Sequence, residues 1–343
     1  MADPLKSPPL TCPSVLTAHE KIKGFIHVTP VLRCTYLDDL ASSKVGAFKV
    51  RGAFHAVRRL MEEEGWEENG GRVRGVVTHS SGNHAQALAL AAKTMGIPAH
   101  IVMPTISMPS KIAATQGYGA KVIFSGSTSV EREAKVEEVI KETGATLVPP
   151  YDHPDIILGQ GTLGIELQEQ ASEMIREQGR EKGLDAIIAP CGGGGMLSGT
   201  ALSCEGTGIF VFGVEPSFGG ADDCKRGIEQ GKRIESVKSL TIADGLRTPV
   251  GVYPWSIIYE RKLVREMFSV GEEEIKKALR LVLERMKVVV EPSAVVGLAV
   301  ALFDEGFRRM VEREGGEEGW DLGIVFSGGN VGIEALRGLF PAS

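Results

Sequence analysis

The sequence lacks the features that are typical of secreted and membrane-spanning proteins. Its five cysteines lie far apart and form neither a C-x-x-C pair nor a Cys/His zinc pattern, which indicates reduced thiols in a cytoplasmic protein. The first residues contain no apolar segment of the kind found in a secretory signal, so we expect none. The longest apolar stretch, 294–303, is too short to cross a bilayer and is predicted to be a buried helix.

The sequence also has no long basic run and no complete dinucleotide-binding motif. Its net charge is −6 at pH 7, so we expect no nucleic-acid partner. Its longest glycine run does not fit G-x-G-x-x-G with an acidic residue about 20 positions later, which argues against a Rossmann-type nucleotide module.

Glycine and apolar residues, in contrast, are plentiful. The chain has 343 residues, of which 43 are glycine and 43% are hydrophobic. A chain of this length can form one large domain or two smaller ones, each with its own core.

Short apolar runs and longer alanine- or leucine-rich segments alternate from Arg74 onwards, which predicts a parallel sheet with crossover helices. We predict a small α/β domain over 74–150 and a large domain formed by 1–73 and 151–343. The predicted strands are 76–78, 99–103, 122–124, 146–148, 186–190, 210–214 and 323–326. The predicted helices include 83–94, 110–116, 130–143, 161–178 and 196–202, a helix near 37–41, and one that ends near Met61. Ser269 and Glu272 suggest a capping box before a helix with an apolar stripe at Ile275, Leu279, Val282 and Met286.

Four consecutive glycines follow one predicted strand and precede a predicted helix. Without Cβ atoms, Gly192–Gly195 can bring backbone N–H groups close to a ligand. The first free N–H groups of the helix point to the same place, where the helix dipole favours an anion. A flexible loop is the simpler interpretation of a glycine run alone, and a phosphate site is the alternative.

Two other predicted strands also end in small polar loops, Ser80–His84 and Ser327–Asn330. In an open α/β sheet the carboxyl ends of the strands form the ligand crevice. Lys49 adds a candidate nucleophile, because the small and apolar residues around it would partly desolvate its ammonium group and lower its pKa.

Taken together, these residues resemble the fold-type II pyridoxal-phosphate (PLP) enzymes, of the tryptophan synthase β-like fold, and among them serine racemases and serine/threonine dehydratases. The resemblance covers nearly the whole chain. It implies two open, twisted, mostly parallel sheets with helices on both faces. The motifs that carry it are 47–53, 80–86, 192–196, 241–245, 291–292 and 327–330.

The resemblance implies a role for each motif. Lys49 would bind the PLP aldehyde covalently and later take the α-proton, and Phe48 would pack beside the ring. Asn83 would donate to the phenolic oxygen of PLP, and Ser327 would meet the pyridine nitrogen. The phosphate would bind the backbone of Gly192, Gly193, Gly194, Gly195 and Met196. The implied substrate-binding residues are Ser80, Ser81, Asn83, His84 and Asp244.

Ser81 is the residue that distinguishes possible activities. A racemase needs a second proton donor opposite Lys49, and serine racemases have serine at the position of Ser81, whereas typical threonine dehydratases have alanine. Eukaryotic threo-3-hydroxyaspartate dehydratases share this serine. We therefore expect racemisation of L-serine, or dehydration of L-serine or a close β-hydroxy amino acid to a keto acid and ammonia. Ammonia-lyase activity on threo-3-hydroxyaspartate or threonine is the alternative.

The resemblance further implies a Mg²⁺ or Ca²⁺ site at Glu215, Asp223 and the carbonyl of Ala221, because oxygen ligands suit these ions. The family keeps the two acids closer together, so an insertion near 218–220 could make Gly219 the carbonyl donor. A solvated acidic loop is the simpler reading without the resemblance.

One segment departs from the family. The family has a strand before the lysine motif, but here 40–43 runs almost directly into Lys44. A catalytically disabled relative that still binds PLP or an amino acid is therefore a second hypothesis. The resemblance also implies a homodimer and a small amino-acid substrate, with no membrane partner and no regulatory domain after 327–330.

Overall fold

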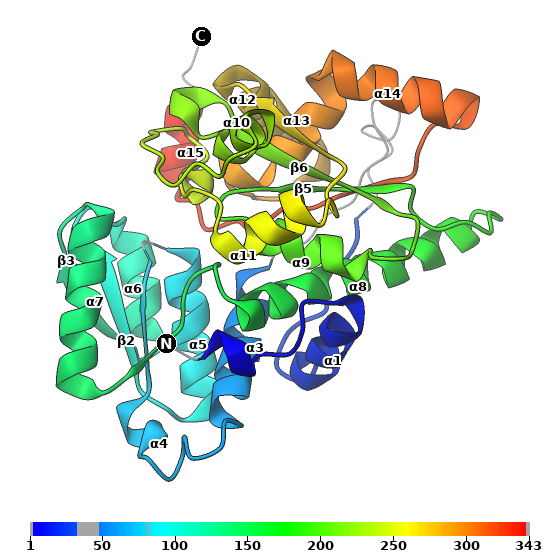
Figure 1. The fold of residues 1–343 in the computed structure, drawn as a ribbon. Coiled ribbons are helices and arrows are strands. Elements are labelled where there is room, and N and C mark those ends of the chain that lie inside the picture. Colours follow the sequence, from blue (N-terminus) through cyan, green and yellow to red (C-terminus); the bar gives the residue numbers. More distant parts are fainter. Residues whose placement is uncertain (1–2, 33–47, 81, 341–343) are drawn as a thin grey trace.

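The computed structural model describes residues 3–32, 48–80 and 82–340, which form two four-stranded parallel sheets (Figure 1). The predicted helix near 37–41 and the segment 40–44 lie outside the described residues. The first sheet has the order β3-β2-β1-β4, with β1 Val76–His79, β2 Ala99–Pro104, β3 Lys121–Ser125 and β4 Thr146–Leu147. The second has the order β7-β6-β5-β8, with β5 Ala186–Pro190, β6 Phe210–Pro216, β7 Glu266–Val270 and β8 Leu322–Ile324.

Helices cover both faces of these sheets, as expected for parallel strands joined by crossovers. Those on the N-terminal side of β5 are α1 Cys12–Ile22, α3 Lys49–Met61, α4 Gly71–Arg74, α5 Asn83–Met95, α6 Pro109–Gly117, α7 Ser129–Thr143 and α8 Pro154–Arg176. Those that follow are α9 Gly195–Ser203, α10 Asp223–Gln230, α11 Val252–Trp255, α12 Glu272–Leu281, α13 Val296–Phe303, α14 Glu305–Gly315 and α15 Ile333–Leu339.

Alternate residues of the central strands pack on opposite sides of the second sheet. Ile188 of β5 lies in the core formed with α12 and α13, whereas Ile187 and Ala189 lie in the core formed with α8 and α9. Figure 1 shows these two pairs of helices on opposite sides of β5 and β6. Successive side chains of a strand point to opposite faces, so an unbroken apolar run is what a strand buried on both faces requires.

The long helix α8 begins at Pro154, seven residues before the predicted start at 161. Its glycines explain how it packs against its neighbours. A Cβ on Gly159 would lie 2.7 Å from the Cα of Gly52 in α3, and a Cβ on Gly161 would lie 2.6 Å from the carbonyl oxygen of Gly199 in α9. Glycine weakens a helix by about 1 kcal/mol, but here it lets three helix backbones approach closely. This packs α3, which begins at Lys49, and α9, which begins at Gly195, against the same part of α8.

The capping box predicted at Ser269 and Glu272 is wrong. Ser269 lies in β7, and Gly271 is the N-cap of α12 without a side-chain hydrogen bond. The Glu272 carboxylate accepts instead from the hydroxyl of Thr241 (2.6 Å) and the amide of Ile242 (2.9 Å). Of the predicted apolar stripe, Ile275, Leu279 and Val282 are fully buried and Met286 is partly buried against the same core. The last two lie in the π-helical segment Val282–Met286 that follows α12.

Within the described ranges, every helix is too short or too polar to span a lipid bilayer.

Candidate functional site

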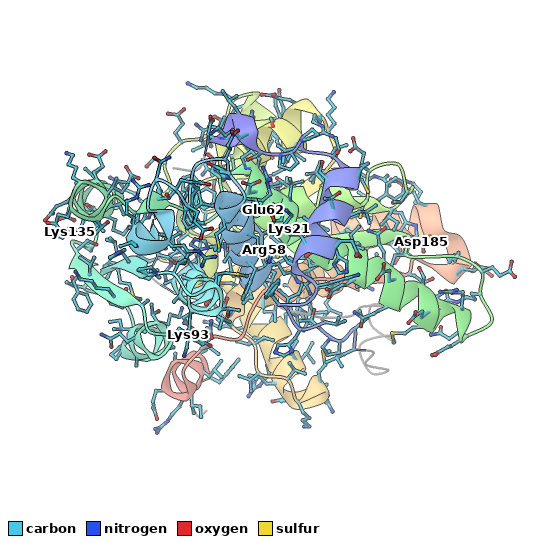
Figure 2. The ribbon with its side chains drawn as sticks, turned by 90° about the horizontal axis from the view of Figure 1, so that it is seen from below. Lys21, Arg58, Glu62, Lys93, Lys135 and Asp185 are labelled. Carbon is cyan, nitrogen blue, oxygen red and sulfur yellow. The ribbon has the colours of Figure 1, made fainter. Side chains whose placement is uncertain are left out.

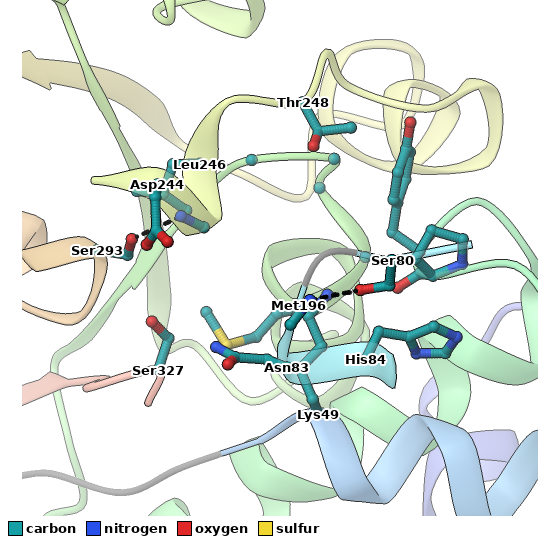
Figure 3. Close-up of a pocket in the computed structure, with 18 of the residues that line it drawn as sticks. Lys49, Ser80, Asn83, His84, Met196, Asp244, Leu246, Thr248, Ser293 and Ser327 are labelled. Carbon is teal, nitrogen blue, oxygen red and sulfur yellow. Dashed lines mark hydrogen bonds between the residues drawn. The ribbon is translucent and has the colours of Figure 1, made fainter. Parts of the chain in front are cut away.

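A cavity of about 390 Å³ lies where the loops that follow β1, β5 and β8 meet (Figure 3). Ser81 lies outside the described residues. All other predicted cofactor- and substrate-binding residues line this cavity: Phe48, Lys49, Ser80, Asn83, His84, Gly192, Gly193, Gly194, Gly195, Met196, Asp244 and Ser327. They come from positions up to about 280 residues apart, and the carboxyl ends of parallel strands bring them together.

Lys49 is the first residue of α3, and its side chain reaches into the cavity (Figure 3). Its Nζ donates to the carbonyl oxygen of Pro150 (3.3 Å) and lies 4.9 Å from the centre of the Phe48 ring. Burial lowers the pKa of this amine to about 8, although the nearby Glu291 carboxylate acts in the opposite direction. At pH 7 an amine with this pKa is about 10% neutral, against about 0.03% at its ordinary value.

The helix that carries Lys49 is held by a buried ion pair. Arg51 donates to both carboxylate oxygens of Glu166 in α8, at 2.7 and 2.5 Å, and its Nη1 also donates to Thr162 (3.2 Å). Two parallel charge-assisted hydrogen bonds fix direction as well as distance. Arg51 therefore positions the start of α3 relative to α8.

The glycine loop is closely enclosed, and no larger residue fits there. A Cβ on Gly193 would lie 2.3 Å from the ring of Tyr151, and one on Gly195 would lie 2.9 Å from the Tyr151 carbonyl oxygen. Gly194, the N-cap of α9, has φ +84° and therefore adopts the left-handed conformation that glycine favours. The residues at the start of α9 line the cavity, and its first amide groups have no partner within the helix.

Asn83 joins the loops after β1 and β8. Its Nδ2 donates to Oε1 of Glu291 (2.8 Å), and its Oδ1 accepts from Nδ2 of Asn330 (2.8 Å). Burial and the nearby Asp244 carboxylate raise the pKa of Glu291. The other oxygen of Glu291 is buried and has no hydrogen-bond partner in the described part of the chain. Two of the predicted loops are thus connected directly.

His84 is buried behind Lys49 and is neutral. Burial, and then the nearby Lys49 ammonium, lower the pKa of its imidazole to about 3. Its Nε2 lies 3.3 Å from the carbonyl oxygen of Val148, which indicates that Nε2 carries the hydrogen. Its Nδ1 is then an acceptor, and it has no partner among the described residues.

Sequence reasoning assigned no role to several residues of the cavity. Lys111 in α6 donates to Asp244 (2.9 Å), and Ser293 accepts from the amide of Gly245 (2.9 Å). Lys111 could have been predicted from the sequence, because it follows the end of β2 by a few residues, as Ser80 follows β1. Tyr151 follows β4 in the same way, but an aromatic residue after a short strand is not by itself a site signal.

The predicted metal ligands lie at the end of β6, outside the cavity lining. Glu215, Asp223 and Ala221 are all buried. The Glu215 carboxylate accepts from the amides of Cys224 (3.0 Å) and Lys225 (2.9 Å), and Asp223 accepts from the amide of Val250 (2.9 Å). Burial is the main cause that raises the pKa of Asp223 to about 6 and that of Glu215 well above its ordinary value.

Comparison with known proteins gives a consistent result. Residues 23–328 match the pyridoxal-phosphate dependent enzyme family. The chain is 40% identical over 333 residues to the L-threo-3-hydroxyaspartate ammonia-lyase of Saccharomyces cerevisiae, which covers 93% of each protein. It is 40% identical over 342 residues to the serine racemase of Arabidopsis thaliana, which covers 96% of each. The solved structure of maize serine racemase superposes with a TM-score of 0.84, at 37% identity and over 96% of each chain. The chain therefore belongs to the pyridoxal-phosphate dependent enzymes of fold type II.

Proposed function

We propose that the protein is a PLP-dependent enzyme that racemises L-serine, or dehydrates L-serine or a close β-hydroxy amino acid to a keto acid and ammonia. One observation carries this proposal. A half-buried lysine with a lowered pKa shares a cavity with a four-glycine loop at a helix N-terminus. The relatives named above as serine racemase and hydroxyaspartate ammonia-lyase support the reaction class.

The residues of the cavity fit PLP. The glycine loop lines the cavity without presenting side chains, and its amides can bind a phosphate. The Asn83 amide uses one of its N–H groups for Glu291, so a second remains for the cofactor. Ser327 would offer a hydroxyl to the cofactor nitrogen in place of a carboxylate, which weakens the electron sink and favours loss of a β-substituent.

When bound, PLP acts as an electron sink that acidifies the α-hydrogen of an amino acid. Lys49 Nζ would take this proton, and its lowered pKa gives it the neutral fraction that a base needs. The loop that contains Ser80 precedes α5, whose free N–H groups would hold the substrate carboxylate. Because His84 is neutral, it adds no positive charge that would draw the substrate carboxylate away from these N–H groups.

The resemblance supports four further proposals. We infer that Glu215, Asp223 and the Ala221 carbonyl bind Mg²⁺ or Ca²⁺, because they offer the oxygen ligands that these ions take and a bound cation would compensate the two buried carboxylates. We also infer a homodimer and a cytoplasmic location. The first sheet lies wholly within 76–147, which supports a small domain over 74–150, with 1–73 and 151–343 forming the large PLP-binding domain.

The first test replaces Lys49. Lys49→Ala should abolish the near-visible absorption that appears when PLP is added to the wild-type protein, and should lower turnover by a factor of at least about 10⁴, since it removes both the covalent anchor and the base. The exposed Lys93 in α5 provides the control, and Lys93→Ala should behave as wild type. A normal absorption band in Lys49→Ala would refute the assignment. Turnover by the wild-type protein would exclude the second hypothesis, that the protein binds PLP or an amino acid but is catalytically disabled.

The second test separates the two activities. Ser81→Ala should abolish formation of D-serine while pyruvate formation falls less than about tenfold, because elimination does not need a second base. Chiral chromatography and a keto-acid assay on the same samples measure both products. Equal loss of both would contradict Ser81 as the second base. Running the assays with L-serine, L-threonine and L-threo-3-hydroxyaspartate, each with and without Mg²⁺, ranks the substrates.

A further inference from the structure

Behind the glycine loop, two cysteines and a glutamate come together in a cluster that the proposed reaction does not use. We call Cys191, Glu215 and Cys224 the thiol cluster. Their ligand atoms, the two sulfurs and a carboxylate oxygen, all lie within 4.8 Å of one another. All three residues are fully buried.

The backbone fixes the position of each member of the thiol cluster. Pro190 of β5 pairs with Val214 of β6, and the amide of Cys191 donates to the Val214 carbonyl oxygen (2.8 Å), so Cys191 and Glu215 are neighbours across the sheet. Glu215 in turn accepts from the amide of Cys224 at the start of α10 (3.0 Å). A strand end, a strand and a helix start thus hold the three donors in place.

The cluster has the chemistry of a site for a thiophilic cation. Around a tetrahedral Zn²⁺ with Zn–S distances near 2.3 Å, two sulfurs are about 3.8 Å apart, so small movements of the side chains would complete the geometry. In the described part of the chain, the Glu215 carboxylate accepts hydrogen bonds from the backbone amides of Cys224 (3.0 Å) and Lys225 (2.9 Å). A bound cation would add a full positive charge to these amide dipoles.

We propose that Cys191, Cys224 and Glu215 bind one thiophilic divalent cation, Zn²⁺ or Cd²⁺, with release of both thiol protons to solvent. This site is distinct in chemistry from the proposed Mg²⁺ or Ca²⁺ site, because those ions take oxygen ligands and not thiolates. The two sites share Glu215, so a cation at one site affects binding at the other. Because Cys191 directly precedes Gly192, a cation here also fixes the base of the glycine loop.

Cadmium is the suitable probe, because its bonds to thiolates absorb in the ultraviolet. Titration of the reduced, metal-free full chain with Cd²⁺ should produce this absorption with a stoichiometry of one per chain. Cys191→Ser and Cys224→Ser should each remove the absorption and weaken Cd²⁺ binding by more than about 100-fold, since loss of outer partners alone costs 10–100-fold. Isothermal titration calorimetry measures the affinity independently of the absorption.

Cys12 and Cys204 form a matched control outside the thiol cluster. Cys204 is buried, as Cys191 is, and the Cys12 sulfur lies 3.7 Å from the carbonyl oxygen of the neighbouring Ser203. The double variant Cys12→Ser/Cys204→Ser should keep the absorption and the affinity. If this variant loses them, or if the two cluster variants keep them, the proposal is wrong.

Folding and disulfide formation are checked separately. Thermal unfolding shows that each variant is folded, and Cys191→Val, which keeps the volume of the side chain, replaces Cys191→Ser if the latter is not. Peptide mapping without reductant reports any bond between Cys191 and Cys224. Such a bond, together with no Cd²⁺ uptake after reduction, would overturn the proposal in favour of a redox pair. The binding result does not depend on turnover, so it is separate from a failure of the proposed function.

Discussion

Two buried glutamates, Glu166 in α8 and Glu215 in β6, differ in what faces them. Glu166 meets the guanidinium of Arg51 through two hydrogen bonds, at 2.7 and 2.5 Å. In the part of the chain that the structure describes, the hydrogen bonds to Glu215 come from backbone amides, and the nearby Cys224 and Asp223 are acidic. Both side chains are almost wholly withdrawn from water.

This difference in partners distinguishes a carboxylate with a structural role, Glu166, from one that we propose binds a cation, Glu215. A buried charge needs a partner, because transfer out of water costs several kcal/mol per ion. The chain itself supplies the partner of Glu166. Asp223 is acted on by Arg226, but burial still raises its pKa, and Glu215 accepts from backbone amides. A metal ion would compensate both carboxylates, and this is why we place cation binding at the end of β6 and not between α3 and α8.

The largest effect is expected at Arg51. Arg51→Met should lower the free energy of unfolding by about 3–5 kcal/mol, because it leaves the Glu166 carboxylate buried and unpaired. Denaturant unfolding of the PLP-free protein measures this change. The double variant Arg51→Met/Glu166→Leu should recover most of the loss, since an apolar pair of similar volume replaces the ion pair. If the double variant were as unstable as the single one, the effect would come from packing and not from charge.

The comparison also shows what the sequence could and could not predict. The loops after β1, β5 and β8 were predictable, because strand, loop and helix follow one another locally in the sequence. The pairing of Arg51 with Glu166 was not, since these residues are 115 positions apart and either alone is an ordinary helix residue.

The predicted start of α8 at 161 is seven residues too late. Glycines at 159, 161 and 164, on both sides of that predicted start, lower the local helix propensity. Packing against α3 and α9 outweighs this penalty, and contacts between distant helices cannot be read from a local pattern. Glu291 is similar: it belongs to one of the motifs, but only the fold shows that it holds Asn83, 208 positions away.

The next largest effect on the free energy of unfolding is expected at Asp223, where the substitution should stabilise the protein and not destabilise it. In metal-free protein at pH 7, Asp223→Asn should raise the free energy of unfolding by up to about 3 kcal/mol, since the wild-type carboxylate, with its pKa raised to about 6, is ionised at a cost. Asparagine keeps an oxygen to accept from the Val250 amide. Chemical unfolding of both proteins at a series of pH values measures the difference.

The direction in which this stability difference changes with pH follows from proton binding to Asp223. Folded Asp223 binds its proton more tightly than the unfolded chain does, so this group makes the metal-free wild type more stable as pH falls from about 6 towards 3.8. The advantage of Asp223→Asn should therefore shrink over this range. Added Mg²⁺ should stabilise the wild type and not the variant, by about 2.7 kcal/mol at 100 times the dissociation constant. A variant that is less stable at pH 7 without metal would show that Asp223 is compensated in some other way.

The smallest effect is expected where an ion pair lies at the surface. Figure 2 shows Lys21 of α1 beside Arg58 and Glu62 at the end of α3. Lys21 contacts Glu62, and Arg58 Nη2 lies 3.7 Å from the same carboxylate. The Glu62 side chain is 38% exposed, so water already solvates it and a partner adds little. Lys21→Met, which keeps the apolar stem, should change the free energy of unfolding by less than about 1 kcal/mol.

A double-mutant cycle of Lys21→Met with Glu62→Gln isolates this pair from its neighbours. The coupling energy should be below about 1 kcal/mol and should fall further in high salt, because screening acts on exposed charges. A coupling as large as that of Arg51 with Glu166 would mean that exposure does not decide the strength of these pairs. The strength of the Arg51–Glu166 pair would then have to come from the geometry of its two hydrogen bonds and not from burial.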